Sequence, residues 1–118
     1  MIPEASPSSG ENPDLLTGVA VSPGVAIGPA RVILKTDSSE HVLPGEILVA
    51  PFTDPGWTPY FISAAGIVMD QGGLLSHGSI IAREYGIPCV VSVNGVCSLP
   101  ENIEVIVDGY QGVILIVR

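Results

Sequence analysis

Basic residues are scarce in this sequence. Lysine and arginine total 4, against 12 aspartate and glutamate residues, which gives a formal net charge of -8. A protein that neutralises phosphate backbones needs clustered basic side chains. The four basic residues are scattered along the chain and form no cluster: Arg31, Lys35, Arg83 and Arg118. We therefore expect neither nucleic acid nor an anionic membrane as a partner.

Charge of either sign is low, and long apolar runs are missing. Charged residues make up 14% of the chain, against about 25% in ordinary soluble domains. This shortage predicts a surface that is covered part of the time. No apolar run approaches the roughly 20 residues of a membrane-spanning helix. The first residues lack the basic stretch followed by an apolar one that marks a secretory signal, so we expect a cytoplasmic protein.

Cysteine is also rare, with only Cys89 and Cys97 present. The two are too far apart for a CxxC motif, and two cysteines do not make a disulfide framework. Together with two histidines at irregular spacing they do not form a zinc pattern, so no metal site is predicted. We expect buried free thiols in a reducing compartment.

The chain is long enough for one domain with a modest core. Residues 1–16 are dominated by Pro, Ser, Gly and Glu, which predicts a flexible tail or linker. Residues 17–118 alternate short apolar runs with turn signals. These runs predict a short helix at 57–65 and strands at 18–21, 25–34, 46–50, 66–69, 89–93, 103–107 and 113–117. We predict the α/β class, with a mixed sheet and the elements in β/β/α layers.

The best helical pattern begins after Ser76, which suits an N-cap. Gly86 provides the stop signal at its other end. Ile80, Ile81 and Tyr85 recur at helical spacing, which predicts that they form the buried stripe of this helix.

The segment from Asp70 to Pro88, DQGGLLSHGSIIAREYGIP, carries the strongest signal for chemistry. It runs from a strand through a glycine-rich loop and a histidine into that helix. A helix N-terminus exposes unpaired N–H groups and a partial positive charge, so it favours a phosphate. The adjacent glycines let a ligand approach the backbone closely, and the nearby serines add hydroxyl donors. The loop fits neither a dinucleotide-binding nor a Walker-type pattern.

His77 occupies the first position of this helix. A cation is disfavoured at a helix N-terminus, so we expect a neutral imidazole, which is a nucleophile. A phosphoryl group on the ring would be an anion where the helix dipole favours one. From local features alone, a partly buried histidine that caps a helix end is an equally good interpretation.

Four stretches, in the same order along the chain, resemble the PEP-utilising enzyme mobile domain. They are GVAVSPGVAIGPA at 18–30, GEILVAPFTDPGW at 45–57, GGLLSHGSIIAREYGIPCVV at 72–91 and DGYQGV at 108–113. The third resembles the phosphohistidine signature of that family, and the resemblance covers about residues 17–117. The family includes phosphoenolpyruvate synthase, pyruvate phosphate dikinase, Enzyme I of the sugar phosphotransferase system and rifampin phosphotransferase.

The resemblance implies a swivelling β/β/α domain that takes a phosphoryl group at one active site and delivers it at another. It identifies His77 as the phosphorylated residue. We expect the phosphate to be supported by the loop and helix start: Gly72, Gly73, Ser76, Gly78 and Ser79. Many members have Thr where this chain has Leu75, so regulation at that threonine is not expected. The LLSHGS form with PFTDPGW upstream is closer to the rifampin phosphotransferase and synthase-like branch.

Phosphoryl transfer needs cations to neutralise developing charge. The only basic residue near His77 in sequence is Arg83, which we place on another face of the helix, complementing its C-terminus. The chain also has no nucleotide-binding loop. We therefore expect a phosphotransferase part that binds no cofactor itself and is inert alone. Mg²⁺ and ATP are expected at nucleotide-binding and substrate-binding domains of the same or a partner chain.

Several residues are weaker candidates. His41 is expected to be solvated and Trp57 to be a core aromatic, although Trp57 in docking is the alternative. Asp54 shares a motif with Trp57. Asp70 would orient the glycine loop or cap a turn, and Asp108 would serve a turn.

Two other functions remain open on the sequence alone. One is a non-catalytic docking module of the same fold, in which His77 is structural. The other is a small-anion binding protein that uses the Gly72–Gly73 loop. The final acceptor, pyruvate or a rifampin-like small molecule, also remains open, as does the imidazole nitrogen that is phosphorylated.

Overall fold

The computed structural model describes residues 14–34, 42–52, 57–100 and 102–117. The described residues form eight strands, two α-helices and one short 3-10 helix. In chain order these are β1 (Leu15–Thr17), β2 (Val19–Ser22), β3 (Val25–Val32), β4 (Ile47–Ala50), α1 (Thr58–Ser63), β5 (Gly66–Met69), α2 (His77–Tyr85), β6 (Cys89–Val91), η3 (Val96–Ser98), β7 (Glu104–Asp108) and β8 (Val113–Val117).

The strands follow the order β1-β8-β7-β3-β4-β5-β6-β2, and the long strand β3 joins two parts of different character. The first part of β3 pairs antiparallel with β7, and β7 and β8 continue that antiparallel part to β1. The last residues of β3 pair parallel with β4, which leads through β5 to β6. The sheet is therefore mixed, as the sequence predicted.

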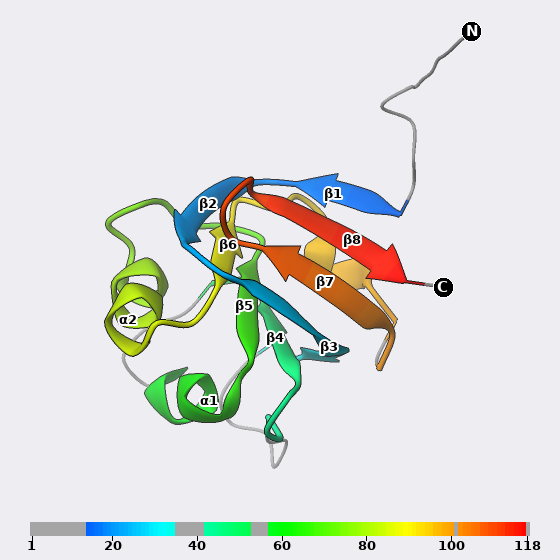
Figure 1. The fold of residues 1–118 in the computed structure, drawn as a ribbon, viewed down its shortest axis with the longest axis horizontal. Coiled ribbons are helices and arrows are strands. Elements are labelled where there is room, and N and C mark those ends of the chain that lie inside the picture. The colour runs from blue at the N-terminus through cyan, green and yellow to red at the C-terminus, as the bar shows by residue number, and fades with distance from the viewer. Residues whose placement is uncertain (1–13, 35–41, 53–56, 101, 118) are drawn as a thin grey trace, which may run out of the picture.

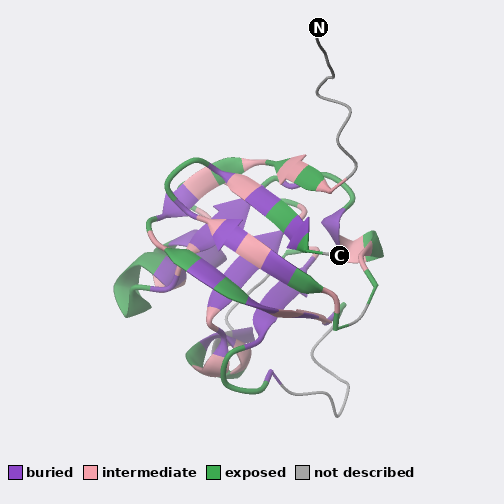
Figure 2. Ribbon diagram, turned by 45° about the vertical axis from the view of Figure 1, so that its right-hand side comes forward, coloured by how far each residue is buried: buried purple, intermediate pink, exposed green. Residues whose placement is uncertain are grey.

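The burial pattern follows from this arrangement. β4, β5 and β6 are buried along their whole length, as parallel strands covered on both faces are. β7 and β8 alternate between buried and exposed residues, because one face of their part of the sheet meets solvent (Figure 2). Helices α1 and α2 lie next to each other on the other side of the molecule from β7 and β8 (Figure 1). The layers are thus the antiparallel part of the sheet, its parallel part and the helices.

Two hydrophobic clusters fill the spaces between these layers. One lies between the helices and the parallel strands and includes Phe61, Leu48, Ile67 and Met69. The other includes Val68, Val105 and Ile114 and joins the parallel strands to the antiparallel part. β5 contributes to both clusters because its side chains alternate between the two faces. The loop that follows β5 therefore starts from a strand that is fixed from both sides.

The structure corrects the sequence analysis at the N-terminal side. Leu15 and Leu16 were expected within the flexible segment but lie in β1, where they pair with Leu115 and Ile114. A three-residue strand without a turn signal on both sides shows no periodicity, so its partner β8 decides its conformation. The 3-10 helix η3 was likewise not predicted.

Helix α2 has the predicted start and end, with Gly86 in the left-handed conformation at its C-cap, but the predicted buried stripe is wrong. Ile80 and Tyr85 are exposed, and Ile81 is only partly buried. The buried residues of the helix are small: Gly78, Ser79 and Ala82. Small side chains let α2 pack closely against β2 and β6, which leaves the larger apolar side chains outside.

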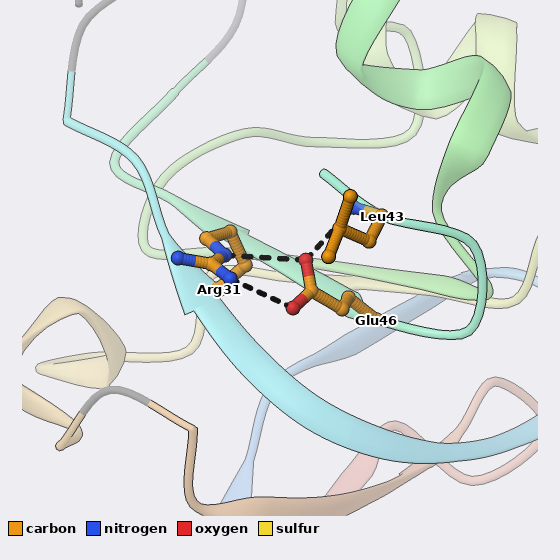
Figure 3. Close-up of polar contacts among 3 residues, drawn as sticks. All are labelled: Arg31, Leu43 and Glu46. Carbon is orange, nitrogen blue, oxygen red and sulfur yellow. Dashed lines mark hydrogen bonds and ion pairs between the residues drawn. The ribbon is translucent and has the colours of Figure 1, made fainter. Parts of the chain in front are cut away.

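An ion pair fixes the start of β4 against β3. Arg31 donates from Nε to Glu46 Oε1 at 3.2 Å and from Nη2 to Oε2 at 2.8 Å (Figure 3). The Leu43 N–H also donates to Oε1, at 2.8 Å. Glu46 is only 6% exposed, so its charge depends on these three donors. The hydrogen bonds from Arg31 lower the pKa of the Glu46 carboxyl below its ordinary value of 4.5, and the Leu43 N–H adds to this against the opposing effect of burial.

We expect Glu46→Gln to lower the free energy of unfolding at pH 7 by about 2 kcal/mol, because a bidentate charged pair becomes a single neutral contact. A lowered carboxyl pKa stabilises the fold above the unfolded-state value and loses that effect as the pH falls through the folded-state value. The difference between wild type and variant should therefore narrow below about pH 4.5. Urea unfolding between pH 3 and pH 8 measures this, with Glu104→Gln at an exposed position as the control. A difference that stays constant with pH would contradict the assignment.

Candidate functional site

His77 lies at the start of α2, directly after the glycine loop that follows β5. Its ring stacks on Phe61 of α1, with 6.2 Å between the ring centroids and 28° between the ring planes. Phe61 is fully buried, so it fixes one side of the imidazole. Nδ1 of His77 is buried and has no hydrogen-bond partner among the described residues. The residue as a whole is partly exposed, so the accessible ring nitrogen is Nε2.

The N-terminus of α2 has no side-chain cap. Ser76 occupies the N-cap position, as predicted, but its hydroxyl does not bond to a backbone N–H of the helix. The Ile80 N–H donates to the Ser76 carbonyl and begins the intrahelical series. The N–H groups of His77 and Gly78 precede that series, so they keep their hydrogen-bonding capacity for a ligand. This is the arrangement that favours an anion next to the His77 ring.

The hydroxyls of the two serines that were predicted to support a phosphate bond to the glycine loop. Ser79 is fully buried and its Oγ donates to the Gly73 carbonyl at 2.6 Å. Ser76 Oγ donates to the same carbonyl at 2.9 Å and lies 2.9 Å from Ser79 Oγ. Both hydroxyls therefore hold the loop. The Ser76 N–H donates to the same Gly73 carbonyl, at 3.1 Å. Support for a phosphate from these two residues remains a prediction.

The two glycines of the loop have separate functions. Gly72 has a φ of +128°, which side chains rarely tolerate, and a Cβ there would approach Ser76 Oγ and Val91. Gly73 is outside the left-handed region, and a Cβ there would meet nothing within 4 Å. Gly72 is thus required by backbone conformation, whereas Gly73 leaves open space beside the loop.

This difference predicts opposite results for one substitution at the two positions. Gly73→Val should fold with a melting temperature within a few degrees of wild type and lose phosphoryl uptake, because its branched side chain enters the open space. Gly72→Val should lose about 2–3 kcal/mol of stability, because a β-branched residue is strained at positive φ. Urea unfolding of both variants measures the contrast. Equal losses of stability would show that Gly73 is also required by the backbone.

Arg83 makes hydrogen bonds that the sequence did not predict. It lies in the last turn of α2, but its guanidinium donates to the Val21 carbonyl of β2 at 3.0 Å and to the Leu74 carbonyl of the glycine loop. Its position near the C-terminus of α2 is as expected, but its guanidinium bonds to carbonyls outside that helix end. A long side chain reaches back over its helix, and spacing around the helix alone does not show this.

Three exposed apolar side chains lie close to His77 in the sequence. Leu74 is 56% exposed, Leu75 85% and Ile80 44%. Two of them precede Ser76 and the third lies one turn into α2, so all three are close to His77 along the chain. Exposed apolar side chains that gather beside a reactive group mark a surface that a partner covers.

The weaker candidates have structural places. Trp57 is 4% exposed and its ring contacts Tyr60, so it is a core aromatic. Asp70 accepts from the Gly95 N–H at 3.3 Å and so caps a turn rather than orienting Gly72 and Gly73. Asp108 accepts from the N–H groups of the next turn, as predicted. His41 and Asp54 lie outside the described residues.

Both cysteines are free. Cys89 is buried, as expected, whereas Cys97 is only partly buried. Burial raises the pKa of the Cys89 thiol to about 12, against a smaller lowering by Arg83. Burial also raises the pKa of the Cys97 thiol, and the nearby Asp70 carboxylate adds to the effect. Neither thiol is therefore a nucleophile at neutral pH.

The comparisons with known proteins decide the family. The family model described as PEP-utilising enzyme, mobile domain, matches residues 42–112. The chain belongs to this family. Curated relatives are also similar to this chain. Rifampicin phosphotransferase of Bacillus cereus is 47% identical over 102 residues, which cover 86% of this chain. A probable phosphoenolpyruvate synthase of Staphylothermus marinus is 43% identical over 103 residues, which cover 85% of it.

A solved structure agrees with the family and with the predicted fold. The N-terminal domain of Enzyme 1 - Nitrogen superposes with a TM-score of 0.55 at 28% identity, over 69% of this chain and 33% of that one. The α/β class with a mixed sheet is thereby confirmed for the mobile domain. None of the helices among the described residues has the length and apolar character needed to cross a bilayer.

The mobile domain is a small part of its relatives. The chain spans 12% of the length of both the Bacillus cereus and the Staphylothermus marinus proteins. These relatives are named as a phosphotransferase and a synthase, which supports membership of a transferase family. In them a domain of this kind occurs beside much more polypeptide.

Proposed function

We propose that this mobile domain is a phosphohistidine carrier of a transferase, and that Nε2 of His77 bears the phosphoryl group. One observation carries the proposal. The accessible nitrogen of a ring fixed by Phe61 lies at the first residue of a helix whose leading N–H groups have no side-chain cap. A nucleophile and an anion-binding helix end therefore meet at one place.

The chemistry of such a carrier has two steps. In the first, the Nε2 lone pair attacks the phosphorus of a donor. The N–P bond forms, the bond from phosphorus to the leaving oxygen breaks, and that oxygen keeps the bonding electrons. In the second, an acceptor oxygen attacks the same phosphorus and the N–P electrons return to Nε2. The N–H groups of His77 and Gly78 would bind the phosphoryl oxygens between the two steps.

The domain would depend on other domains for cations. Among the described residues, no three His, Cys, Asp or Glu side chains lie close enough together to hold a metal ion. Arg83 uses its guanidinium on two carbonyls of the chain itself. Mg²⁺, ATP and the neutralising cations would be supplied by a nucleotide-binding domain, and the acceptor, pyruvate or a rifampin-like small molecule, by a substrate-binding domain.

The apolar surface beside His77 supports docking to such domains. Leu74, Leu75 and Ile80 are exposed close to His77 in the chain, and a docked domain would cover them and exclude water from the transferring group. Because the same residues would face each partner in turn, their exposure in the isolated domain fits the function of a carrier.

Mass spectrometry under alkaline conditions, which preserve phosphohistidine, tests the proposal. The chain is mixed with cell extract and ATP, digested, and examined for a phosphorylated peptide that contains His77. We expect the modification on His77. Absence of the modification, while an added Enzyme I or synthase control is labelled in the same extract, would favour a non-catalytic docking module of the same fold.

A further inference from the structure

Three consecutive carbonyls of the glycine loop each accept a hydrogen bond from a side chain. The Gly72 carbonyl accepts from Ser92 Oγ at 2.9 Å. The Gly73 carbonyl accepts from the two serine hydroxyls of the helix start. The Leu74 carbonyl accepts from Nη2 of Arg83. The Gly73 carbonyl also accepts from the Ser76 N–H at 3.1 Å. Side chains therefore hold all three successive peptide planes that lead into His77, and a backbone turn helps to hold the middle one.

This arrangement also decides where the N–H groups of the loop point. The described peptide bonds are trans, and in a trans peptide the N–H points opposite to the carbonyl of the same plane. The N–H groups of Gly73, Leu74 and Leu75 are therefore directed away from the side chains that hold the carbonyls. These three N–H groups have no acceptor among the described residues. The loop thus pairs its partial negative charges with the protein and leaves its donors free.

Two of the holding side chains come from outside the loop and the helix start. Arg83 bonds the edge strand β2 through Val21 as well as the loop, so it ties the two together. Ser92 follows β6 and has a φ of 57°, in the left-handed region that side chains other than glycine seldom adopt. Such strain persists where the surrounding structure requires a particular side chain, and here the side chain at that position bonds Gly72.

We propose that Arg83 and Ser92 are positioning residues for His77: they orient the Leu74 and Gly72 peptide planes so that the loop presents N–H groups rather than carbonyls to an arriving phosphoryl group. This rests on the proposed function of His77. Neither residue touches the phosphoryl group in this account. Each acts through a loop carbonyl on the reactivity of the adjacent ring.

Phosphoramidate, a small chemical phosphoryl donor, tests the inference without a partner domain. The site-mapped rate of phosphorylation of His77 is measured relative to His41 in the same molecule, which corrects for the general reactivity of histidine. The variants are Ser92→Gly and Arg83→Gln, with Arg83→Lys as a partial replacement that keeps the charge but not the forked geometry. Asn102→Gly is the matched control for Ser92→Gly, because Asn102 also has a positive φ, of 67°. Glu84→Gln controls for a lost charge on α2.

We expect the His77 to His41 ratio to fall about tenfold in Ser92→Gly and Arg83→Gln, to recover partly in Arg83→Lys, and to stay unchanged in both controls. Ser92→Gly should keep or raise the melting temperature, since glycine relieves the positive φ. Substitution of a residue with only a structural role would lower the reactivity of His77 and the melting temperature together. The inference is overturned if wild-type His77 reacts no faster than His41, or if the ratio is unchanged in the variants or falls equally in the controls.

A second assay, labelling by a nucleotide-binding domain with ATP, separates this inference from the proposed function. If the ratio responds as expected but a nucleotide-binding domain with ATP never labels His77, the proposed function fails and the positioning stands. If the nucleotide-binding domain labels His77 at the wild-type rate in all variants, the positioning inference fails and the proposed function stands.

Discussion

His77→Ala is expected to abolish phosphoryl uptake while the domain stays folded. In this account His77 supplies the nucleophile, and the helix N-terminus beside it only binds the anion that results. The assay mixes the chain with a nucleotide-binding domain, labelled ATP and Mg²⁺, and counts label on the protein after alkaline separation. Uptake should fall to the background of the assay.

The stability of this variant should change little. His77 is partly exposed and its main contact is the ring stack on Phe61, so we expect a loss of about 1 kcal/mol. His41→Ala is the control and should take up label like wild type. If the His77→Ala chain still carried labelled phosphohistidine, His41 would be the carrier and the assignment of the site would be wrong.

The isolated 118-residue chain is expected to be inert towards ATP. Its net charge of -8 repels a nucleotide. The nearest basic side chain to His77 in sequence, Arg83, already bonds the Val21 and Leu74 carbonyls. Charge neutralisation is often the largest contribution to such chemistry, so a nucleophile without it should react at a negligible rate.

Adding a nucleotide-binding domain in trans, with Mg²⁺, should restore labelling of His77. Transfer should be slow, because untethered domains lose the high effective concentration that a linker provides. Intact-protein mass spectrometry over time measures both conditions, with the His77→Ala chain as the control. Stoichiometric labelling of the chain alone, at the rate of an ordinary enzyme turnover, would show an autonomous kinase and not a carrier.

Periodicity and turn signals predicted most of the fold. The strand at 66–69, the helix start after Ser76 and the strand at 113–117 all lie where the sequence placed them. Strand β1 was missed because its conformation depends on pairing with β8. The exposed face of α2 was also missed, since Gly78, Ser79 and Ala82 are small and an apolar pattern gives them little weight beside isoleucine.

In the candidate site, too, local features were predicted from the sequence and contacts between separated residues were not. The order of glycine loop, histidine and helix is local, so the sequence contained it. The stacking of Phe61 on His77 and the bonds from Ser92 and Arg83 to the loop carbonyls join residues that are separated in the chain. No pattern of spacing encodes such contacts. Ser92 had one available signal, its place directly after a strand, and that signal predicts only a turn.

The central claim is that the phosphoryl group on His77 is an intermediate in transfer. A chase experiment tests it most directly. The chain is labelled by the donor domain, purified under alkaline conditions, and then mixed with a substrate-binding domain and its acceptor in the absence of ATP. The account predicts that label leaves His77 and appears on the acceptor in equal amount. Label that stays on His77, or leaves only as inorganic phosphate at the rate seen without acceptor, would contradict it.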